Sequence, residues 1–426
     1  MKRSIFTAMM AIAFAPVTHA AGFAWTNYLG NNDFGAFSNW WSSANVLTTF
    51  TTNSLRINHF GANRAVISNT VDSSLSSCGS VQLATTATST GEVLVTSGTN
   101  AFGAMTQVGL RGVGIFTLID GSVAFPTSYT TIAENTNSVG IFNMSGGSFT
   151  TDRMTVATTN DAVGTVIITG GTVAIARSNT TSSTAGHLRM GRGAAQIHIG
   201  GSAQVTVEFL LFGKTNNVPI DPGFMTMSNG VLNITGATWT NASPITFCPG
   251  RTAAFEGGVW NVAGNLTAEI EQAIADGYIF HSKGNNLITV VYSNSINTTV
   301  VKLREPTSLE AWRYQHFGTT ENAGNAANTA DLEKDGIPNL AEFAFGLHPL
   351  QCSACQLPMC AVSGGNLTIE FPKPGGVSGI AYGAESSTNL INWSAVTNSG
   401  GGTTNIFSIA VGSEPRMFMR LLATEQ

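Results

Sequence analysis

The chain has 426 residues, of which 43% are hydrophobic and only 10% are charged, and its formal net charge is −5. A charged fraction so far below the usual quarter excludes a charge-driven disordered chain. The acidic balance argues against a duplex nucleic-acid partner, because there is no basic surplus to neutralise phosphates. The 47 glycines, together with many Thr, Ser and Asn residues, indicate strands joined by turns.

The first twenty residues have the pattern of a secretory signal peptide. Lys2 and Arg3 precede an apolar run from Ile5 to Ala15, and small residues follow as far as Ala20. A run of about a dozen residues is too short to cross a hydrocarbon core ~30 Å thick, which argues against a membrane anchor. The sequence therefore predicts a signal peptide over residues 1–20 and an exported protein, secreted or at the cell surface, without a membrane span.

Between Gly91 and Trp260 the sequence repeats a short phrase of alternating apolar residues that ends in a small residue. The closing positions, 21 to 36 residues apart, are Gly98, Gly121, Gly147, Gly171, Gly201, Ala237 and Gly258. A second phrase lies between them and consists of an apolar residue followed by a small one, as in Val108-Gly109 and Val156-Ala157. Each repeat therefore offers two or three short strands around a corner.

One such unit cannot bury its own apolar face, so the units are expected to stack as rungs with equivalent side chains in ladders. We predict parallel pairing that places Val93, Ile115, Ile141 and Val166, or their immediate neighbours, in one inward ladder. An antiparallel sandwich is the competing architecture, since strands with a period of two and glycine turns fit it as well.

The opening segment AWTNYLGNNDFGAFSNWWSSANV places Trp25, Trp40 and Trp41 before Asn45, and the rungs follow the phrase Gly-x-apolar-x-apolar-x-Gly-Gly. These features resemble the secreted bacterial autotransporter-type repeat proteins, over roughly residues 22 to 300. The resemblance implies a right-handed parallel β-solenoid (β-helix). Residues 21–90 would then form an N-terminal cap and the first rungs, with the tryptophans covering an otherwise open strand edge.

The solenoid is expected to span residues 91–302 and to end on a cap. This cap should contain a helix with Thr267 as its N-cap, Ile270 and Ile274 on its apolar face, and Gly277 as its terminator, followed by two strands.

Residues 303–350 differ in composition and predict a separate helical module, with ten charged residues in 48. Thr307 and Glu310 have the spacing of a capping box for a helix that carries Leu309, Trp312 and Phe317. A second helix is predicted from Pro338 to Phe345, ending at Gly346.

Between these two helices lie twelve residues that match an EF-hand-type calcium loop. Asp331, Glu333 and Asp335 occupy positions 1, 3 and 5, and Gly336 supplies the turn at position 6. Ile337 offers its carbonyl at position 7, Asn339 stands at 9 and Glu342 at 12. We predict a Ca²⁺ site with the metal ligands Asp331, Glu333, Asp335, Ile337, Asn339 and Glu342. The alternative is a solvated acidic helix start, with Asp335 capping the helix that follows.

The loop resembles the dockerin-like and thrombospondin-type calcium loops of exported bacterial proteins. Their usual phrase has Asp at the third position, where this chain has Glu333, and the longer side chain could weaken the site or bring in a bridging water. A paired second loop is absent from the sequence, so the resemblance does not extend to cohesin-type docking.

Residues 351–426 alternate again and predict a C-terminal β-sandwich. The residues Tyr382, Ser387, Leu390 and Trp393 form a phrase that resembles the small β-sandwich closing many exported bacterial proteins. We expect Trp393 to lie in the core rather than to stack on a ligand.

Five cysteines are too few for a disulfide scaffold. Cys78 and Cys248 are expected to be small buried residues. Cys352, Cys355 and Cys360 lie close together in a chain expected to be exported, and one local disulfide is favoured over zinc because a fourth ligand at suitable spacing is missing.

Catalytic motifs are scarce in the sequence. No nucleophile elbow, Walker A loop or dinucleotide fingerprint occurs, and the histidines have no metal-binding spacing. The acidic residues of the repeats do not line up as the carboxylate pair that a polysaccharide lyase or hydrolase needs.

We therefore expect a non-enzymatic structural or adhesive protein without catalytic residues, whose partners are extracellular glycans or cell-surface components. The alternative is a carbohydrate-binding or polysaccharide-degrading β-helix protein.

Overall fold

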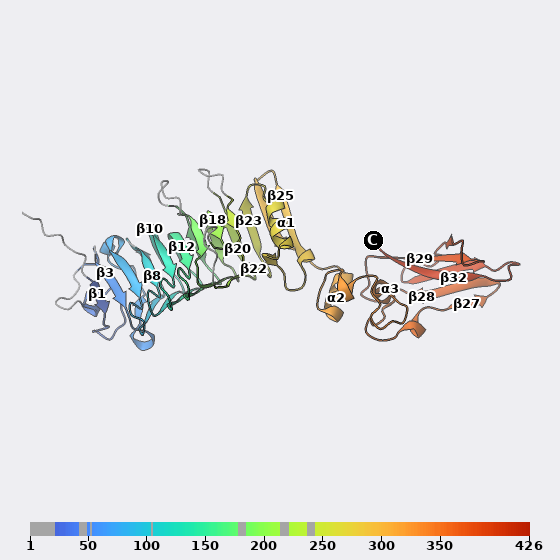
Figure 1. Cartoon of the computed structure of the whole chain (residues 1–426), viewed down its shortest axis with the longest axis horizontal. Coiled ribbons are helices and arrows are strands. Elements are labelled where there is room, and N and C mark those ends of the chain that lie inside the picture. Colours follow the sequence, from blue (N-terminus) through green and yellow to red (C-terminus); the bar gives the residue numbers. More distant parts are fainter. Residues whose placement is uncertain are drawn as a thin grey trace, which may run out of the picture. The chain divides into compact units, whose positions relative to one another are not determined.

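The computed structural model describes residues 22–41, 49–51, 53–103, 105–177, 185–213, 221–236 and 243–426 (Figure 1). The predicted signal peptide, Asn45 and the closing residue Ala237 lie outside these ranges. The chain divides into two compact units, Met1–Thr252 with Trp260–Ala263, and Ala253–Val259 with Gly264–Gln426. The division passes through β22 (Arg251–Phe255).

The first unit is a parallel β-solenoid, within a structure of about 8 turns, which confirms the predicted architecture over the antiparallel sandwich. One side is formed by β4 (Ala65–Ile67), β6 (Thr90–Val95), β9 (Val113–Leu118), β11 (Val139–Met144), β13 (Val163–Ile168), β16 (Ala194–Ile199) and β19 (Gly223–Met227). Successive strands of this side pair in parallel with one strand per turn. The repeat spacing therefore corresponds to one turn of backbone.

The remaining sides of the solenoid form a second sheet. Its strands in the first unit are β1 (Gly22–Trp25), β2 (Trp40–Trp41), β3 (Ser54–Ile57), β5 (Ser80–Leu83), β7 (Thr99–Ala101), β8 (Thr106–Val108), β10 (Ser122–Ile132), β12 (Ser148–Val156), β14 (Thr172–Ile175), β15 (His187–Met190), β17 (Gln204–Val207), β18 (Phe209–Leu211), β20 (Val231–Ile234), β21 (Ile245–Thr246) and, from Trp260 on, β23 (Val259–Ala263). Pairing is again parallel from turn to turn, as in β10–β12 and β12–β15.

The inward ladder of the first sheet contains Val93 and Val166, as predicted, with Phe116 and Phe142 between them in place of Ile115 and Ile141. Phe116 pairs with Phe142 and both are buried, whereas Ile115 pairs with Ile141 and both are partly exposed on the outer face. Parallel pairing is thus confirmed, but the inward residues are the neighbours of Ile115 and Ile141. The reason is that each strand carries two adjacent apolar residues, and only the register of the whole turn decides which of them points inside.

The corners of the solenoid explain its small residues. Gly121 has a φ of 90°, and a Cβ atom there would lie 2.6 Å from the carbonyl oxygen of Gly98 on the preceding rung. The second corner also uses left-handed backbone, with φ values of 62° at Ala133 and 56° at Ala157. Close rung-to-rung approach is therefore a physical reason for the glycines that end the first phrase.

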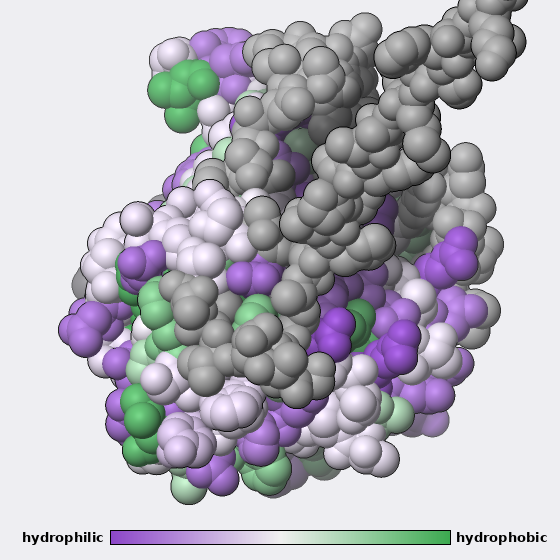
Figure 2. Space-filling view, turned by 90° about the vertical axis from the view of Figure 1, so that its left-hand side faces the viewer, coloured by the Kyte–Doolittle hydropathy of each residue, from purple (hydrophilic) through white to green (hydrophobic). Residues whose placement is uncertain are grey.

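Tryptophan side chains close the N-terminal end. β1 and β2 pair antiparallel, and Trp25 and Trp40 are almost fully buried with their rings 5.2 Å apart. The indole N–H of Trp25 donates to the carbonyl of Asn63, and that of Trp40 donates to the carbonyl of Phe34. Figure 2 faces this end, where the coloured hydrophobic residues are scattered among hydrophilic and neutral ones.

From Gly264 on, the second unit contains first α1 (Thr267–Ala275), then β24 (Ile279–Phe280) and the antiparallel pair β25 (Ile288–Ser293) and β26 (Thr298–Leu303). The helix buries Ile270 and ends before Gly277, as predicted. The predicted N-cap is wrong. Thr267 is the first helical residue, and its hydroxyl donates to the side-chain oxygen of Asn265 rather than accepting a backbone N–H of the helix.

Two further helices follow, α2 (Ser308–Phe317) and α3 (Asn339–Phe345). The capping box of Thr307 and Glu310 is present, and α3 ends at Gly346 in the left-handed conformation, so both helix predictions are confirmed. In the described part of the chain, no helix is long and apolar enough to cross a membrane.

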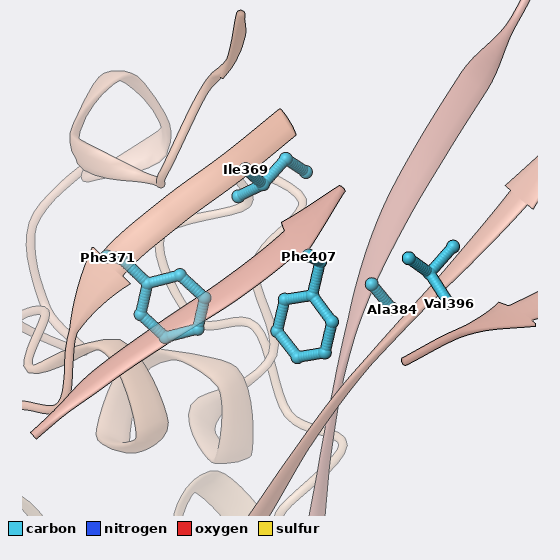
Figure 3. Packing of buried hydrophobic residues seen from close by; sticks show 5 residues of the cluster. All are labelled: Ile369, Phe371, Ala384, Val396 and Phe407. Atoms are coloured by element: carbon cyan, nitrogen blue, oxygen red, sulfur yellow. The ribbon is translucent and has the colours of Figure 1, made fainter. Parts of the chain in front are cut away.

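The C-terminal residues form two three-stranded antiparallel sheets. One contains β27 (Cys360–Ser363), β28 (Asn366–Pro372) and β31 (Thr404–Ala410), and the other contains β29 (Ile380–Ser387), β30 (Ser394–Val396) and β32 (Phe418–Glu425). Buried side chains of both sheets meet in one cluster, shown in Figure 3: Ile369, Phe371, Ala384, Val396 and Phe407.

The expectation that Trp393 lies in this core is wrong. Trp393 is partly exposed, and the guanidinium of Arg420 covers its ring at 4.1 Å from the centroid. The indole N–H donates to the carbonyl of Leu390, so the ring lies over a turn outside the cluster. The Trp393 ring is thus packed against a guanidinium in a cation–π contact.

The cysteines follow the predictions only in part. Cys78 and Cys248 are buried, as expected. Cys352, Cys355 and Cys360 are exposed free thiols, so the expected local disulfide is not formed. Spacing along the chain does not bring two thiols into disulfide geometry unless the intervening backbone turns appropriately.

Candidate metal centre

Three of the predicted ligands come together between α2 and α3. One carboxylate oxygen from each of Asp331, Glu333 and Asp335 lies within 4.8 Å of the other two, and all three side chains are partly exposed. Oxygen atoms at this mutual spacing surround a volume in which one cation could contact each of them. Positions 1, 3 and 5 of the predicted loop therefore converge.

The backbone of the loop curls around its first residue. The two carboxylate oxygens of Asp331 accept hydrogen bonds from the N–H groups of Asp335, at 3.2 Å, and Gly336, at 2.9 Å. Left-handed backbone at Lys334, with φ of 61°, and at Gly336, with φ of 89°, makes this tight curl possible. The local sequence thus fixes where Asp331 points.

Asp335 is held from a distant part of the chain. One of its oxygens accepts the N–H of Ile337 at 3.0 Å, and the other accepts the N–H of Ser353 at 2.6 Å. These hydrogen bonds lower the pKa of Asp335, the one from Ser353 most strongly, and keep the carboxylate ionised. Sequence reasoning missed Ser353, because nothing in the phrase around residue 353 marks it as a partner of the loop.

The fourth carboxylate belongs to Glu342, in the first turn of α3. Its side chain is completely buried, and among the described residues neither of its oxygens nor those of Glu333 has a hydrogen-bond partner. Burial first, and then the adjacent carboxyl group of Glu333 and the charges of Asp335 and Asp331, raise the pKa of Glu342 to about 8. Two adjacent carboxyl groups in a buried position are stable if one of them is protonated, and both can be ionised if a cation lies between them.

The other two predicted ligands play different roles in the described geometry. The amide nitrogen of Asn339 donates to the carbonyls of Asn325 and Ala327, both at 2.8 Å, so this buried side chain ties the start of α3 to the segment before the loop. Its own oxygen has no partner among the described residues. Ile337 is buried, and its backbone N–H is engaged by Asp335.

The donor set fits a hard divalent cation. Carboxylate oxygens are the ligands that Ca²⁺ prefers, and Ca²⁺ tolerates an irregular shell of six to eight of them. Structural zinc sites are built mainly from Cys and His, and among the described residues only the three acids gather at metal-binding distance. The residues that gather at metal-binding distance are therefore Asp331, Glu333 and Asp335, and Glu342 lies beside Glu333.

Comparison with known proteins adds no assignment, since no protein-family model, curated protein or solved structure matches this chain.

Proposed function

We propose that this protein is an exported, non-enzymatic structural or adhesive β-solenoid protein whose helical module binds Ca²⁺ through Asp331, Glu333, Asp335 and Glu342. The observation that carries the calcium proposal is the buried carboxyl group of Glu342, which lies beside Glu333 and has no hydrogen-bond donor among the described residues. Burying an unpaired carboxylate costs several kcal/mol, and a divalent cation offsets that cost where a hydrogen-bond donor does not.

Calcium would have a structural role in this position. Asp335 connects the loop to the backbone at Ser353, and Glu342 lies in α3, whose last turn contacts the C-terminal sheets through the hydrogen bond from Tyr382 to the carbonyl of Ala344. A cation held by both acids would fix the loop, the helix and the following segment together. Binding that occurs only in the folded state adds stability that grows with the logarithm of the ligand excess over Kd.

The test is titration calorimetry of the whole chain with Ca²⁺, combined with thermal unfolding in calcium and in chelator. We expect heat on binding and, at a hundredfold excess over Kd, about 2.7 kcal/mol of added stability. Glu342→Gln should remove this gain while leaving the chelated protein at least as stable as the unmodified one, because the variant relieves the crowding of carboxylates.

The matched control is Glu305→Gln, which removes one negative charge from an exposed position of the same module. It should bind calcium like the unmodified protein. The calcium proposal fails if millimolar calcium produces no heat, or if Glu305→Gln and Glu342→Gln lose calcium stabilisation equally. A response to Mg²⁺ as strong as to Ca²⁺ would instead indicate a small octahedral site.

The structural or adhesive part of the proposal is supported by the solenoid itself. Its interior is filled by closely packed side chains such as Phe116, Phe142 and Phe149, and tryptophans close its first turn. Incubation with acidic polysaccharides tests the non-enzymatic assignment. We expect neither shorter polysaccharide chains nor an unsaturated product. Either outcome would establish the lyase or hydrolase alternative.

A further inference from the structure

The solenoid carries a cluster of charged side chains far from the calcium loop in the sequence. From Gly91 to Gly264 the chain has only seven basic residues, Arg111, Arg153, Arg177, Arg189, Arg192, Lys214 and Arg251. Three of these, Arg153, Arg177 and Arg189, lie close enough to His187 to lower the pKa of its imidazole ring. Like charges repel, so their convergence in a chain with so few of them calls for a physical reason.

The strand register brings the cluster together. Tyr129 of β10 pairs with Arg153 of β12, and the guanidinium of Arg153 lies 4.6 Å from the centroid of the Tyr129 ring. The backbone N–H of Gly186 donates to the carbonyl of Asp152 at 2.6 Å, which places the next residues, Arg153 and His187, beside each other. Three rungs of the solenoid therefore contribute to one spot.

Arg189 extends the cluster along the same face. It pairs with Thr155 of β12, two residues beyond Arg153. The intervening residues, Met154 and Leu188, are buried inside the solenoid, and side chains alternate along a strand. Arg153, His187 and Arg189 are accordingly on the outer face, where all three are partly exposed.

The acidic neighbours do not balance all of this positive charge. Glu208 accepts the backbone N–H of Arg177 at 3.0 Å and lies 3.6 Å from its guanidinium Nε, so Arg177 is engaged by Glu208. Asp152 is the other acid near His187. Arg153, Arg177 and Arg189 thus outnumber the two nearby acids, Asp152 and Glu208, and the local charge is positive although the whole chain carries −5.

His187 stays uncharged in this setting. Burial first, and then Arg189, Arg153 and Arg177, lower its pKa to about 4, so at neutral pH the ring is a hydrogen-bonding group rather than a fourth cation. Its ring packs against that of Phe209 at 4.9 Å. The patch therefore combines two guanidinium groups, those of Arg153 and Arg189, with two rings, those of Tyr129 and His187.

We propose that this outer patch, formed by Tyr129, Arg153, His187 and Arg189, binds a sugar chain that carries carboxylate or sulfate groups. A guanidinium presents parallel N–H donors that match the oxygens of either anion, and an anion between Arg153 and Arg189 offsets their repulsion. Partly exposed rings beside such groups give a sugar ring an apolar surface to cover. This site lies in the first unit and goes beyond the calcium-binding function proposed for the second.

The experiment measures binding of the whole chain to four probes. Polygalacturonate carries carboxylates only, dextran sulfate carries sulfates only, dextran is the uncharged form of the same backbone, and a single-stranded oligonucleotide is a polyanion without these sugars. We expect polygalacturonate or dextran sulfate to bind and dextran and the oligonucleotide not to bind. Which of the first two binds identifies the anion, and binding of neither overturns the proposal.

Variants locate the site. Arg153→Gln and Arg189→Gln should each weaken binding about tenfold or more, since a charge-assisted hydrogen bond is lost. Arg111→Gln, which removes the same charge from an exposed position of the same solenoid, should leave the Kd unchanged. Equal losses in Arg111→Gln, or oligonucleotide binding as tight as that of the glycan, would mean non-specific attraction and refute the site.

Folding of each variant is checked by its melting temperature. Arg189→Lys keeps the charge without the parallel N–H donors and should bind with intermediate affinity, so it replaces Arg189→Gln if that variant does not fold. Unweakened binding in folded Arg153→Gln refutes the proposal. Because Glu342→Gln should bind the glycan normally, failure of the calcium centre and failure of this patch are distinguishable.

Discussion

Truncation of Phe142 tests the packing of the solenoid most directly. Its side chain is fully buried, its ring stacks on that of Phe116 at 5.6 Å, and it meets Phe149 edge to face at 4.8 Å. Phe142→Ala removes a buried ring and leaves a cavity between Phe116 of one sheet and Phe149 of the other. Large-to-small changes of this kind cost about 3–5 kcal/mol, and each aromatic pair accounts for about 0.5–1.5 kcal/mol.

The matched control is the adjacent residue in the same strand. Ile141 points to the outer face and is partly exposed, so Ile141→Ala should cost only about 1 kcal/mol. Urea unfolding followed by circular dichroism gives both values, with the slope checked because a solenoid can unfold by parts. If Ile141→Ala is as costly as Phe142→Ala, the register described for β11 is wrong.

Three further predictions rest on other contacts. Nη2 of Arg304 lies 2.6 Å from Oε1 of Glu310, and this hydrogen bond is the main reason that the pKa of Glu310 falls from its usual 4.5 to about 2. The ion pair therefore stabilises the folded protein fully above pH 5, and this stabilisation is lost as the pH falls toward 2. Glu310→Gln should therefore cost about 1–2 kcal/mol at pH 7 and almost nothing near pH 2, as measured by denaturant unfolding, and an unchanged difference across this range would contradict the ion pair. Gly140→Ala would place a Cβ atom 2.2 Å from the backbone nitrogen of Ala133, so it should lower stability by about 1–3 kcal/mol or prevent folding, whereas the partly exposed Val139→Ala should cost less than half as much. In thiol labelling of the native protein, three cysteines should react quickly and two only after unfolding, and fast labelling of all five would show that the solenoid interior is open.

The amino-acid sequence alone determined the features that depend on neighbours along the chain. The repeat interval, with a small residue at each corner, indicated a stacked parallel solenoid, because corners need left-handed or close-packed backbone wherever rungs touch. The capping box at Thr307 and the terminator at Gly346 located α2 and α3, since caps act within one turn of helix. The spacing of Asp331, Glu333 and Asp335 likewise implied their convergence, because five residues of loop suffice to bring them together.

Tertiary structure decided whatever depends on residues distant along the chain. Whether Ile115 or Phe116 points inside follows from register across several rungs, and two adjacent apolar residues do not distinguish the alternatives. The anchoring of Asp335 by Ser353 and the burial of Glu342 against Glu333 arise from packing between segments. The grouping of Arg153 with Arg189 was equally invisible in the sequence, because 36 residues separate them there and strand pairing brings them onto one face.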